Sequence, residues 1–246
     1  MVTNAPLPVA FVTGGARRIG RAIVEDLAAH GWDVAIHHHH SHEEAEEIAA
    51  GIRARGGRAT LVQGDLGDQT CHTEMIADAA KALGPLTLLV NNASIFEKDT
   101  VGTLDRALFD RQIAVNLAAP VFLAEAFANA LPADMEGNVV NLLDQRVFRP
   151  TPVYFSYQLA KSALHIATIT MAQALAPRIR VNAIAPGPVL PSAQGGPERF
   201  AKQVAGTLLR RAPDLADFGR TIRYLVETRS ITGQVVSLDS GQHLTP

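Results

Sequence analysis

Residues 9–20 read VAFVTGGARRIG, and this stretch decides the fold. Its first four residues are apolar and predict a short strand buried on both faces, while the glycines at 14 and 15 predict a tight turn. Gly20 then opens a helix with apolar spacing through Ile23 and Leu27. Because free backbone N–H groups at a helix N-terminus bind anions, this strand, turn and helix predict a site for the pyrophosphate of a dinucleotide.

The remainder of the chain repeats the alternation of strand and helix. The predicted strands cover residues 8–13, 33–38, 58–63, 86–91, 137–143, 178–184 and 234–239. The predicted helices cover residues 18–30, 42–55, 70–83, 104–130, 154–175 and 214–227. Strands joined through helices form parallel sheets with right-handed crossovers, so we predict the α/β class: a single-domain Rossmann fold over residues 1–246, with a seven-stranded parallel sheet and helices on both faces.

The composition favours a protein that works on small molecules. With 246 residues, 47% of them hydrophobic, the chain can bury the core of one α/β domain. Its net charge of −2 gives no electrostatic reason to bind nucleic acid or an anionic membrane. Cys71 is the only cysteine, which excludes an internal disulfide, and the N-terminus lacks a signal-peptide pattern. No apolar run approaches the ~20 residues that span a bilayer, so we expect a cytoplasmic protein.

Two further segments place polar residues where a ligand crevice is expected. NNAS at residues 91–94 follows the apolar strand at 86–90. Tyr157 and Lys161 lie four positions apart and therefore on the same helix face. An ammonium at Lys161 is placed to lower the pKa of the phenol and to reach a ribose.

With TGGARRIG at 13–20, NNAS at 91–94, Asn116 and the YxxxK pair, the chain resembles the short-chain dehydrogenase/reductase family over almost its whole length. The resemblance implies that Tyr157 donates a proton, that Lys161 binds the nicotinamide ribose, and that Asn116 anchors a water relay to that lysine. It also implies that Asp65 contacts adenine. The cofactor-binding residues that it implies are Gly14, Arg17, Arg18, Ile19, Gly20, His40, Ser41, Asp65, Leu66, Asn92, Ala93, Ser94, Tyr157, Lys161, Pro186 and Gly187.

The segment HHHHS at 37–41 ends the second predicted strand and favours NADP(H) as the cofactor. A carboxylate there would bind a free ribose 2′-hydroxyl and repel a 2′-phosphate, whereas this chain offers His40 and Ser41, with Arg17 in the glycine turn. Two ordinary surface residues are the alternative interpretation of His40 and Ser41. We expect no metal at the four histidines, because alternate strand residues face opposite ways and no Cys or acidic ligand set lies nearby.

Departures from the family pattern point to a narrower branch. The position thirteen residues before Tyr157 holds Asp144, where most members carry serine, and Arg18 replaces the central glycine of the turn. Together with Ser94, Phe96 and the His40-Ser41 segment, these residues resemble the pteridine reductase branch. The resemblance implies a pterin ring stacked between the nicotinamide and Phe96, although Phe96 could equally be a core residue. The implied substrate-binding residues are Arg18, Ser94, Phe96, Asp144 and Tyr157.

The resulting hypothesis is hydride transfer from NADPH to a C=N bond of a dihydropterin or dihydrofolate-like ring. Its catalytic residues would be Asn116, Asp144, Tyr157 and Lys161, with Asp144 orienting Tyr157 or the ring, or relaying a proton itself. Two alternatives stay open: a carbonyl reductase or alcohol dehydrogenase of the same family, and a protein that senses NADP(H) without turnover.

Two expectations concern the periphery of the site. Residues Pro186 to Pro197, PGPVLPSAQGGP, predict no regular element and are interpreted as leading into a substrate lid, with a plain surface loop as the alternative. Tyr154 is expected to line the pocket. The helices at 104–130 and 154–175 are rich in Ala, Leu and Ile, and the family resemblance implies that they pair between subunits, so we expect a dimer or tetramer.

Overall fold

The computed structural model describes residues 8–191 and 195–245. Its strands form one seven-stranded sheet in the order β3-β2-β1-β4-β5-β6-β7, and every neighbouring pair is parallel. The strands are β1 (Val9–Val12), β2 (Asp33–His38), β3 (Ala59–Gln63), β4 (Leu88–Asn91), β5 (Gly137–Leu142), β6 (Ile179–Pro186) and β7 (Val235–Leu238). The predicted Rossmann sheet is confirmed.

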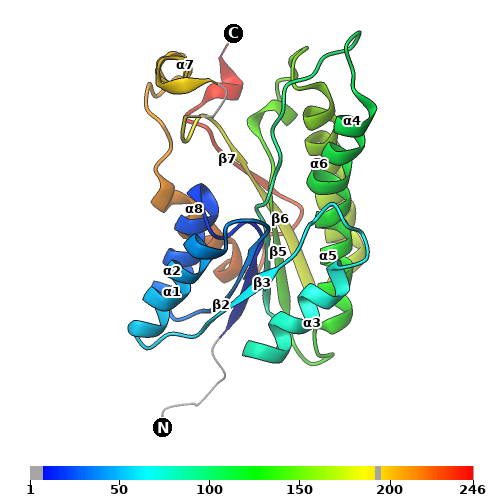
Figure 1. Ribbon diagram of the computed structural model, residues 1–246, viewed down its shortest axis with the longest axis vertical. Helices are drawn as coiled ribbons and strands as arrows, with labels where there is room; N and C mark the ends of the chain where they lie inside the picture. Colours follow the sequence, from blue (N-terminus) through cyan, green and yellow to red (C-terminus); the bar gives the residue numbers. More distant parts are fainter. Residues whose placement is uncertain (1–7, 192–194, 246) are drawn as a thin grey trace.

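Helices cover both faces of this sheet (Figure 1). The helices α1 (Arg18–Ala29), α2 (His42–Ala54) and α8 (Leu215–Glu227) lie on one face. On the other face lie α3 (His72–Leu83), α4 (Arg106–Ile113), α5 (Ala119–Ala130) and α6 (Phe155–Leu175). A hydrophobic cluster fills the space under each layer, one around Ile23 and Phe218 and the other around Phe11 and Leu123. These two cores fix the strand ends that build the site.

From β1, the chain adds β2 and β3 on one side of the sheet and then β4 to β7 on the other side. The parallel strands β1 and β4 are therefore neighbours, although two strands lie between them in sequence. In open parallel sheets, ligands bind at such a switch point, outside the carboxyl ends of the strands. Here β1 leads into the glycine turn and β4 into Asn92. The fold therefore brings the first two motifs of the sequence to the same edge of the sheet.

The predicted helix at 104–130 is interrupted. Between α4 and α5 lies a five-residue π-helical segment, Ala114–Ala118, closed by a hydrogen bond from the Ala119 N–H to the Ala114 carbonyl. Pro120 follows at the start of α5 and has no N–H to donate to the carbonyl of Asn116, so a regular α-helical bond is missing there. The wider turn contains Asn116, one of the predicted site residues.

Residues Arg106–Ala130, taken as one helix, are long and apolar enough to cross a membrane by length and composition, and 44% of the apolar window is buried in the protein. The expectation that no apolar run approaches the length of a membrane span was therefore wrong for this segment. Core helices of water-soluble proteins pass the same test, which makes it weak evidence for a membrane span.

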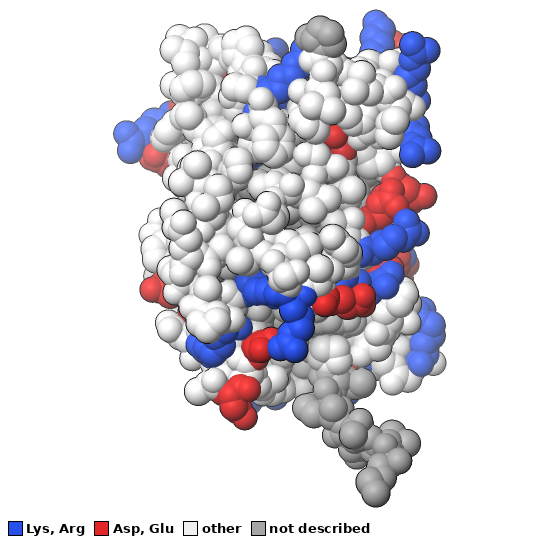
Figure 2. Space-filling model, turned by 180° about the vertical axis from the view of Figure 1, so that it is seen from behind, with Lys and Arg blue, Asp and Glu red and all other residues white. Residues whose placement is uncertain are grey.

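On the face seen in Figure 2, acidic and basic side chains are intermixed and lie mostly toward the edges.

A helix that the sequence did not predict, α7 (Gly196–Ala205), begins within the stretch 186–197. The expectation of no regular element there was wrong at both ends, since β6 also extends to Pro186. Gly196, at φ +63, and Pro197 look like helix breakers, but a proline in the first turn gives up an N–H that has no partner inside the helix. Residues 192–194 of this predicted lid lie outside the described residues.

Candidate active site

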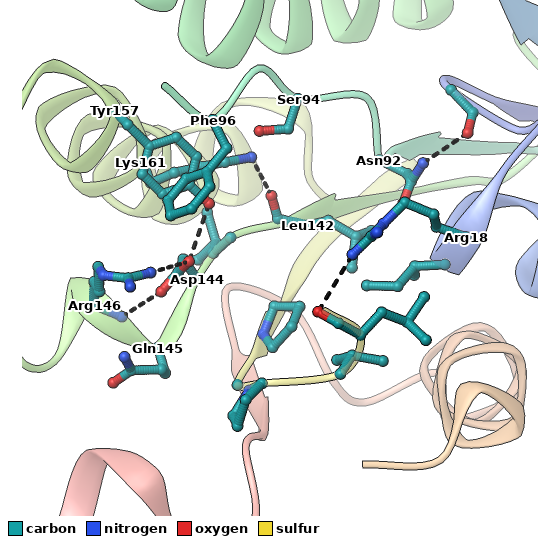
Figure 3. Close-up of a pocket in the computed structure, with 18 of the residues that line it drawn as sticks. Arg18, Asn92, Ser94, Phe96, Leu142, Asp144, Gln145, Arg146, Tyr157 and Lys161 are labelled. Atoms are coloured by element: carbon teal, nitrogen blue, oxygen red, sulfur yellow. Dashed lines mark hydrogen bonds and ion pairs between the residues drawn. The ribbon is translucent and has the colours of Figure 1, made fainter. Parts of the chain in front are cut away.

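A pocket of about 600 Å³ opens at the carboxyl edge of the sheet (Figure 3). It is walled by the glycine turn, the loop after β4, the end of β5, the first turns of α6 and the segment after β6. Fourteen of the predicted site residues line it: Gly14, Arg17, Arg18, Ile19, Gly20, Asn92, Ala93, Ser94, Phe96, Asp144, Tyr157, Lys161, Pro186 and Gly187. Tyr154 also lines it, as expected. The predicted residues outside its lining are His40, Ser41, Asp65, Leu66 and Asn116.

Two positions of the glycine turn favour glycine, Gly14 for its backbone conformation and Gly20 for lack of space. Gly14 has φ +60, and a Cβ on Gly20 would lie 2.1 Å from the Gly14 carbonyl oxygen. Asn92 Nδ2 donates to the carbonyls of Thr13 (2.8 Å) and Gly14 (3.1 Å), which ties the turn to the end of β4. The first turn of α1 therefore faces the pocket as an anion-binding helix N-terminus, which fits a pyrophosphate.

His37 fixes the same turn from β2. Its Nδ1 accepts the Gly14 N–H over 3.1 Å, and its Nε2 lies 3.2 Å from the Gly64 carbonyl. Burial lowers the pKa of His37 to about 4, so the ring is neutral, and the two contacts require that Nε2 carry the proton. In the sequence, His37 is recognisable only as part of a histidine run. Its partner, Gly14, could be found only from the fold.

The residues predicted to bind a 2′-phosphate have other contacts in the structure. Arg17 is exposed and paired with Glu44, a carboxylate on α2 that sequence reasoning missed. His40 is exposed and its ring centroid lies 3.5 Å from that of His39. Asp65, predicted to contact adenine, pairs with Arg111 at 2.7 Å and accepts the Gly67 N–H at 2.8 Å. Arg111 holds the pKa of Asp65 below its usual range.

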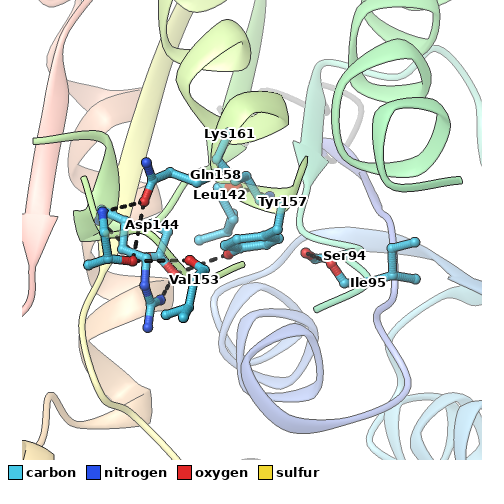
Figure 4. A network of polar contacts seen from close by, with 10 residues as sticks. Ser94, Ile95, Leu142, Asp144, Val153, Tyr157, Gln158 and Lys161 are labelled. Atoms are coloured by element: carbon cyan, nitrogen blue, oxygen red, sulfur yellow. Dashed lines mark hydrogen bonds and ion pairs between the residues drawn. The ribbon is translucent and has the colours of Figure 1, made fainter. Parts of the chain in front are cut away.

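Asn116 lies outside the pocket lining and supports the loop after β4. It is fully buried, and its Oδ1 accepts the Ser94 hydroxyl over 2.8 Å and the Ile95 N–H over 3.0 Å. Its Nδ2 donates to the Ile95 carbonyl over 3.0 Å. Asn116 therefore fixes the loop after β4 that presents Ser94 and Phe96 to the pocket. Ser94 lies opposite the Tyr157 ring in Figure 4.

Asp144 and Tyr157 form the centre of the site. Asp144 directly follows β5 and Leu143, and its Oδ2 accepts the Tyr157 hydroxyl over 3.1 Å (Figure 4). Tyr157 lies in the first turn of α6, which begins after Tyr154 in a left-handed conformation at φ 60. One turn further, Lys161 Nζ donates to the Leu142 carbonyl over 2.6 Å. The predicted trio of Asp, Tyr and Lys therefore lies together at the end of β5.

The pKa values of Tyr157 and Lys161 are both shifted by their surroundings. Burial and the negative charge of Asp144 raise the pKa of Tyr157 well above its usual value, and the charge that opposes them is that of Arg146. Lys161 Nζ lies 5.9 Å from the centre of the Tyr157 ring. Burial lowers the pKa of Lys161 to about 8. The ammonium is directed to a backbone carbonyl, and its expected effect on the phenol stays a prediction.

Phe96 lies within an aromatic group in the pocket. Its ring stacks on Tyr154, with centroids 4.1 Å apart and planes at 12°, and meets Tyr157 edge-on at 4.8 Å. Tyr154 is buried and covers one face of Phe96. Stacked aromatic side chains on a pocket wall provide a flat surface against which a further ring can pack.

Arg146 is the main site residue that sequence reasoning missed. It follows Asp144 by two positions and pairs with it at 2.9 Å, in the one-turn helix η2 (Gln145–Val147). Its guanidinium carbon lies 5.3 Å from the centre of the Phe96 ring and 5.4 Å from that of Tyr154. The only signal in the sequence was an arginine near the unusual aspartate.

The four histidines contribute no metal site in the described part of the chain, where no group of three or more His, Cys, Asp or Glu side chains is placed to hold a metal ion. His37 is used by the glycine turn, and the ring of His38 packs edge-on against His42 with centroids 5.2 Å apart.

Comparison with known proteins identifies the family. The model of the family described as short chain dehydrogenase matches residues 8–199. The chain belongs to the short-chain dehydrogenase family. Its YxxxK pair lines the pocket, together with Gly14 and residues 17–20 of the glycine turn and residues 92–94 of the NNAS segment. Asn91 is buried and donates to Asn141.

The chain is similar in sequence to two curated relatives and in sequence and structure to one solved structure. General stress protein 39 of Bacillus subtilis (strain 168) is 33% identical over 74% of this chain, and the match spans 63% of that relative. Pteridine reductase 1 of Leishmania tarentolae is 31% identical and covers 100% of this chain and 99% of its own. The crystal structure of FolM alternative dihydrofolate reductase 1 from Brucella canis complexed with NADP is 56% identical, with a TM-score of 0.95 over 100% of this chain and 96% of that one.

Proposed function

We propose that this protein is an NADPH-dependent oxidoreductase that reduces a C=N bond of a dihydropterin or dihydrofolate-like ring. The observation that carries the proposal is the hydrogen bond of 3.1 Å between Tyr157 and Asp144, next to the aromatic wall formed by Phe96. Asp144 occupies the place where the family commonly has serine, which changes the group beside the proton donor. The likeness to a pteridine reductase and to an alternative dihydrofolate reductase supports the same substrate class.

The proposed cofactor is NADP(H). The glycine turn, the open N-terminus of α1 and the segment 186–190 form one side of the pocket and fit a dinucleotide. Arg17 is exposed near the end of β2, where it can exchange Glu44 for a 2′-phosphate, and no carboxylate ends that strand. When bound, NADPH supplies the hydride. We propose that Lys161 holds the nicotinamide ribose, since Lys161 lines this pocket one helical turn after Tyr157.

Side chains of the protein would bind the substrate and donate the proton. Phe96 would stack on the ring of the substrate with the face that Tyr154 leaves free, and Ser94 and Arg18 would contact its polar edge. Tyr157 is the proposed proton donor. Its raised pKa keeps the phenol protonated before the reaction, as a general acid must be. Proton transfer from Tyr157 to the substrate nitrogen completes the reduction as the adjacent carbon takes the hydride.

The test is a steady-state assay of NADPH oxidation by the wild-type protein against dihydrobiopterin, dihydromonapterin, dihydrofolate and a panel of ketones, repeated with NADH. We expect the highest kcat/KM for a dihydropterin or dihydrofolate and tighter binding of NADPH than of NADH. Reduction of ketones without any dihydropterin or dihydrofolate would replace the proposal with a carbonyl reductase. Tight NADPH binding without turnover of any substrate would support a cofactor sensor.

We further propose a cytoplasmic homo-oligomer, either a dimer or a tetramer. Large apolar side chains on α5 and α6 are exposed in the single chain, including Phe122 (46%), Leu159 (42%) and Ile166 (59%). Apolar residues grouped on neighbouring helices are typical of surfaces that another protein covers. Light scattering coupled to size exclusion would give the number of subunits, and a monomer would contradict this part of the proposal.

A further inference from the structure

Arg146 holds a defined position between the proposed proton donor and the aromatic wall. Its Nη1 donates to Asp144 Oδ2 over 2.9 Å, and its backbone N–H donates to Asp144 Oδ1 over 2.9 Å. The same Oδ2 accepts the Tyr157 hydroxyl. Guanidinium, carboxylate and phenol therefore form one continuous chain of hydrogen bonds in the pocket (Figure 3).

We propose that Arg146 is a positioning residue for proton transfer: it fixes Asp144 as a hydrogen-bond acceptor aimed at the Tyr157 hydroxyl, so that the substrate receives its proton from Tyr157 and not from Asp144. This inference rests on the proposed function and concerns only its proton step.

The hydrogen bonds around Asp144 support this assignment. Asp144 accepts all three of the hydrogen bonds described above, and a carboxylate that is ionised can only accept. Arg146 occupies both of its oxygens, so Asp144 cannot turn toward a substrate without breaking a charge-assisted contact. The side chains of Arg146 and Asp144 are only 16% and 15% exposed, so water and salt screen this ion pair less than they screen a surface pair.

The contacts of Arg146 itself favour a role in the reaction over a purely structural one. Its Nε is buried without a hydrogen-bond partner among the described residues. A buried donor without a partner is unfavourable, and an arginine that served only to hold the fold would be expected to satisfy it. The side chain is instead held against Phe96 and Tyr154 with its Nη1 on Asp144.

Arg146 also supplies positive charge near the phenol. Lys161 directs its ammonium to the Leu142 carbonyl, whereas the guanidinium of Arg146 shares one carboxylate oxygen with the Tyr157 hydroxyl. The charge of Arg146 lowers the pKa of Tyr157 against the raising effects of burial and Asp144. A phenol with a lower pKa is a stronger acid and transfers its proton faster.

The step balances without a further reactant. The Tyr157 hydroxyl would first turn from Asp144 toward the nitrogen of the C=N bond, since it has only one proton to donate. With NADPH bound as the hydride source for the carbon, that nitrogen would take the proton of Tyr157, which leaves a phenolate. The phenolate regains its proton from solvent. Asp144 and Arg146 keep their charges throughout.

The experiment compares three variants with the wild type. Arg146→Met keeps most of the side-chain length and removes the charge, while Arg146→Lys keeps the charge and loses the planar fork. Arg223→Met is the matched control, because Arg223 forms an ion pair of 2.8 Å with Asp26 at similar exposure, between α1 and α8 and outside the pocket lining. For each protein we would measure kcat, KM, the NADPH Kd, the thermal midpoint and the solvent deuterium isotope effect on kcat.

We expect Arg146→Met to lower kcat by roughly tenfold or more, to leave the NADPH Kd unchanged and to raise the solvent isotope effect, since proton transfer becomes slower. Arg146→Lys should fall between this variant and the wild type, and Arg223→Met should change only the thermal midpoint. A wild-type kcat in Arg146→Met, a loss of kcat with an unchanged isotope effect, or the same loss in Arg223→Met would overturn the inference. If Arg146→Met does not fold, an unchanged isotope effect in Arg146→Lys overturns it.

The outcome can be separated from the test of the proposed function. If the wild type reduces ketones but no dihydropterin or dihydrofolate, the proposed function fails while the same comparison proceeds with a ketone, which also needs a proton from Tyr157. A wild type that turns over neither kind of substrate contradicts both.

Discussion

One hydroxyl group, that of Tyr157, decides whether the site can deliver a proton. We expect Tyr157→Phe to abolish turnover and to leave the NADPH Kd nearly unchanged, because the hydroxyl contacts Asp144 and acts on the proton. Lys161→Ala should weaken NADPH binding as well, because the proposed ribose contact is lost. Steady-state kinetics and fluorescence titration of NADPH measure both effects. A Tyr157→Phe variant that keeps most of its kcat would transfer the role of donor to Asp144 or to water.

The pKa of Lys161 gives a pH dependence with a definite sign. Burial lowers this pKa to about 8, so the free protein loses the ammonium charge as the pH rises through 8. If the bound ribose requires the protonated form, NADPH binding above pH 8 must be accompanied by uptake of a proton, and affinity falls by up to about tenfold per pH unit. NADPH titrations between pH 6.5 and 9.5 would measure this, with Lys161→Met as the variant that should lose the dependence. A Kd that stays constant in the wild type contradicts the assignment.

Phe96 and Asp144 should determine substrate selectivity. Phe96→Ala removes the stacking surface and Asp144→Ser restores the common arrangement of the family, so each should reduce kcat/KM for a dihydropterin more than for a simple ketone. A lost aromatic stack accounts for roughly 0.5–1.5 kcal/mol beyond burial, up to about tenfold. Phe148→Ala, at an exposed phenylalanine outside the pocket lining, is the control. Equal losses on both substrates would show that the residues do not recognise a pterin.

Residue spacing predicted the identity of the site residues better than their interactions. The YxxxK spacing placed Tyr157 and Lys161 on one helix face, and both line the pocket. The direction of the Lys161 ammonium depends on the Leu142 carbonyl, which spacing along a helix does not reveal. Arg146 was missed for a related reason, since its pairing with Asp144 depends on the turn η2 and not on a motif.

At the scale of single elements, the turn between β1 and α1 has the strictest geometry. Gly20→Ala would put a Cβ 2.1 Å from the Gly14 carbonyl oxygen, so the backbone must shift, and we expect a loss of about 1–3 kcal/mol of stability together with weaker NADPH binding. Chemical denaturation and NADPH titration measure these effects. Gly51→Ala in α2, where the nearest atom to a Cβ is a flexible Arg55 side chain at 3.5 Å, should be neutral or stabilising. A Gly20→Ala variant that binds NADPH like the wild type would contradict the role of this turn.

Sequence periodicity predicted most helices but neither the π-helical segment nor α7. Apolar spacing predicted a helix over 104–130 but not the π segment, because that irregularity follows from one missing N–H at Pro120 and from the contacts of Asn116 with the loop after β4. The helix α7 was missed because glycine and proline at its start were interpreted only as breakers. In both cases the distinguishing information is a backbone hydrogen-bond pattern.

At the scale of the whole molecule, the alternation of strands and helices and the rule of right-handed crossovers were sufficient to predict the parallel sheet. The same topology explains why motifs 77 residues apart meet, as when the Thr13 hydroxyl contacts the Val90 carbonyl. Ion pairs between side chains of different elements could not be predicted from the sequence. Arg17 with Glu44 and Asp65 with Arg111 join residues far apart in sequence whose partners no local pattern identifies.

The central claim is that this fold transfers a hydride from NADPH to a C=N bond of a dihydropterin or dihydrofolate. The most direct measurement is incubation of the wild-type protein with NADPH deuterated at the transferable position of the nicotinamide, followed by mass spectrometry and NMR of the pterin product. We expect a tetrahydro product that carries deuterium at the ring carbon of the former C=N bond. A dihydropterin or dihydrofolate recovered unchanged, or a reduced product without deuterium, would contradict the claim.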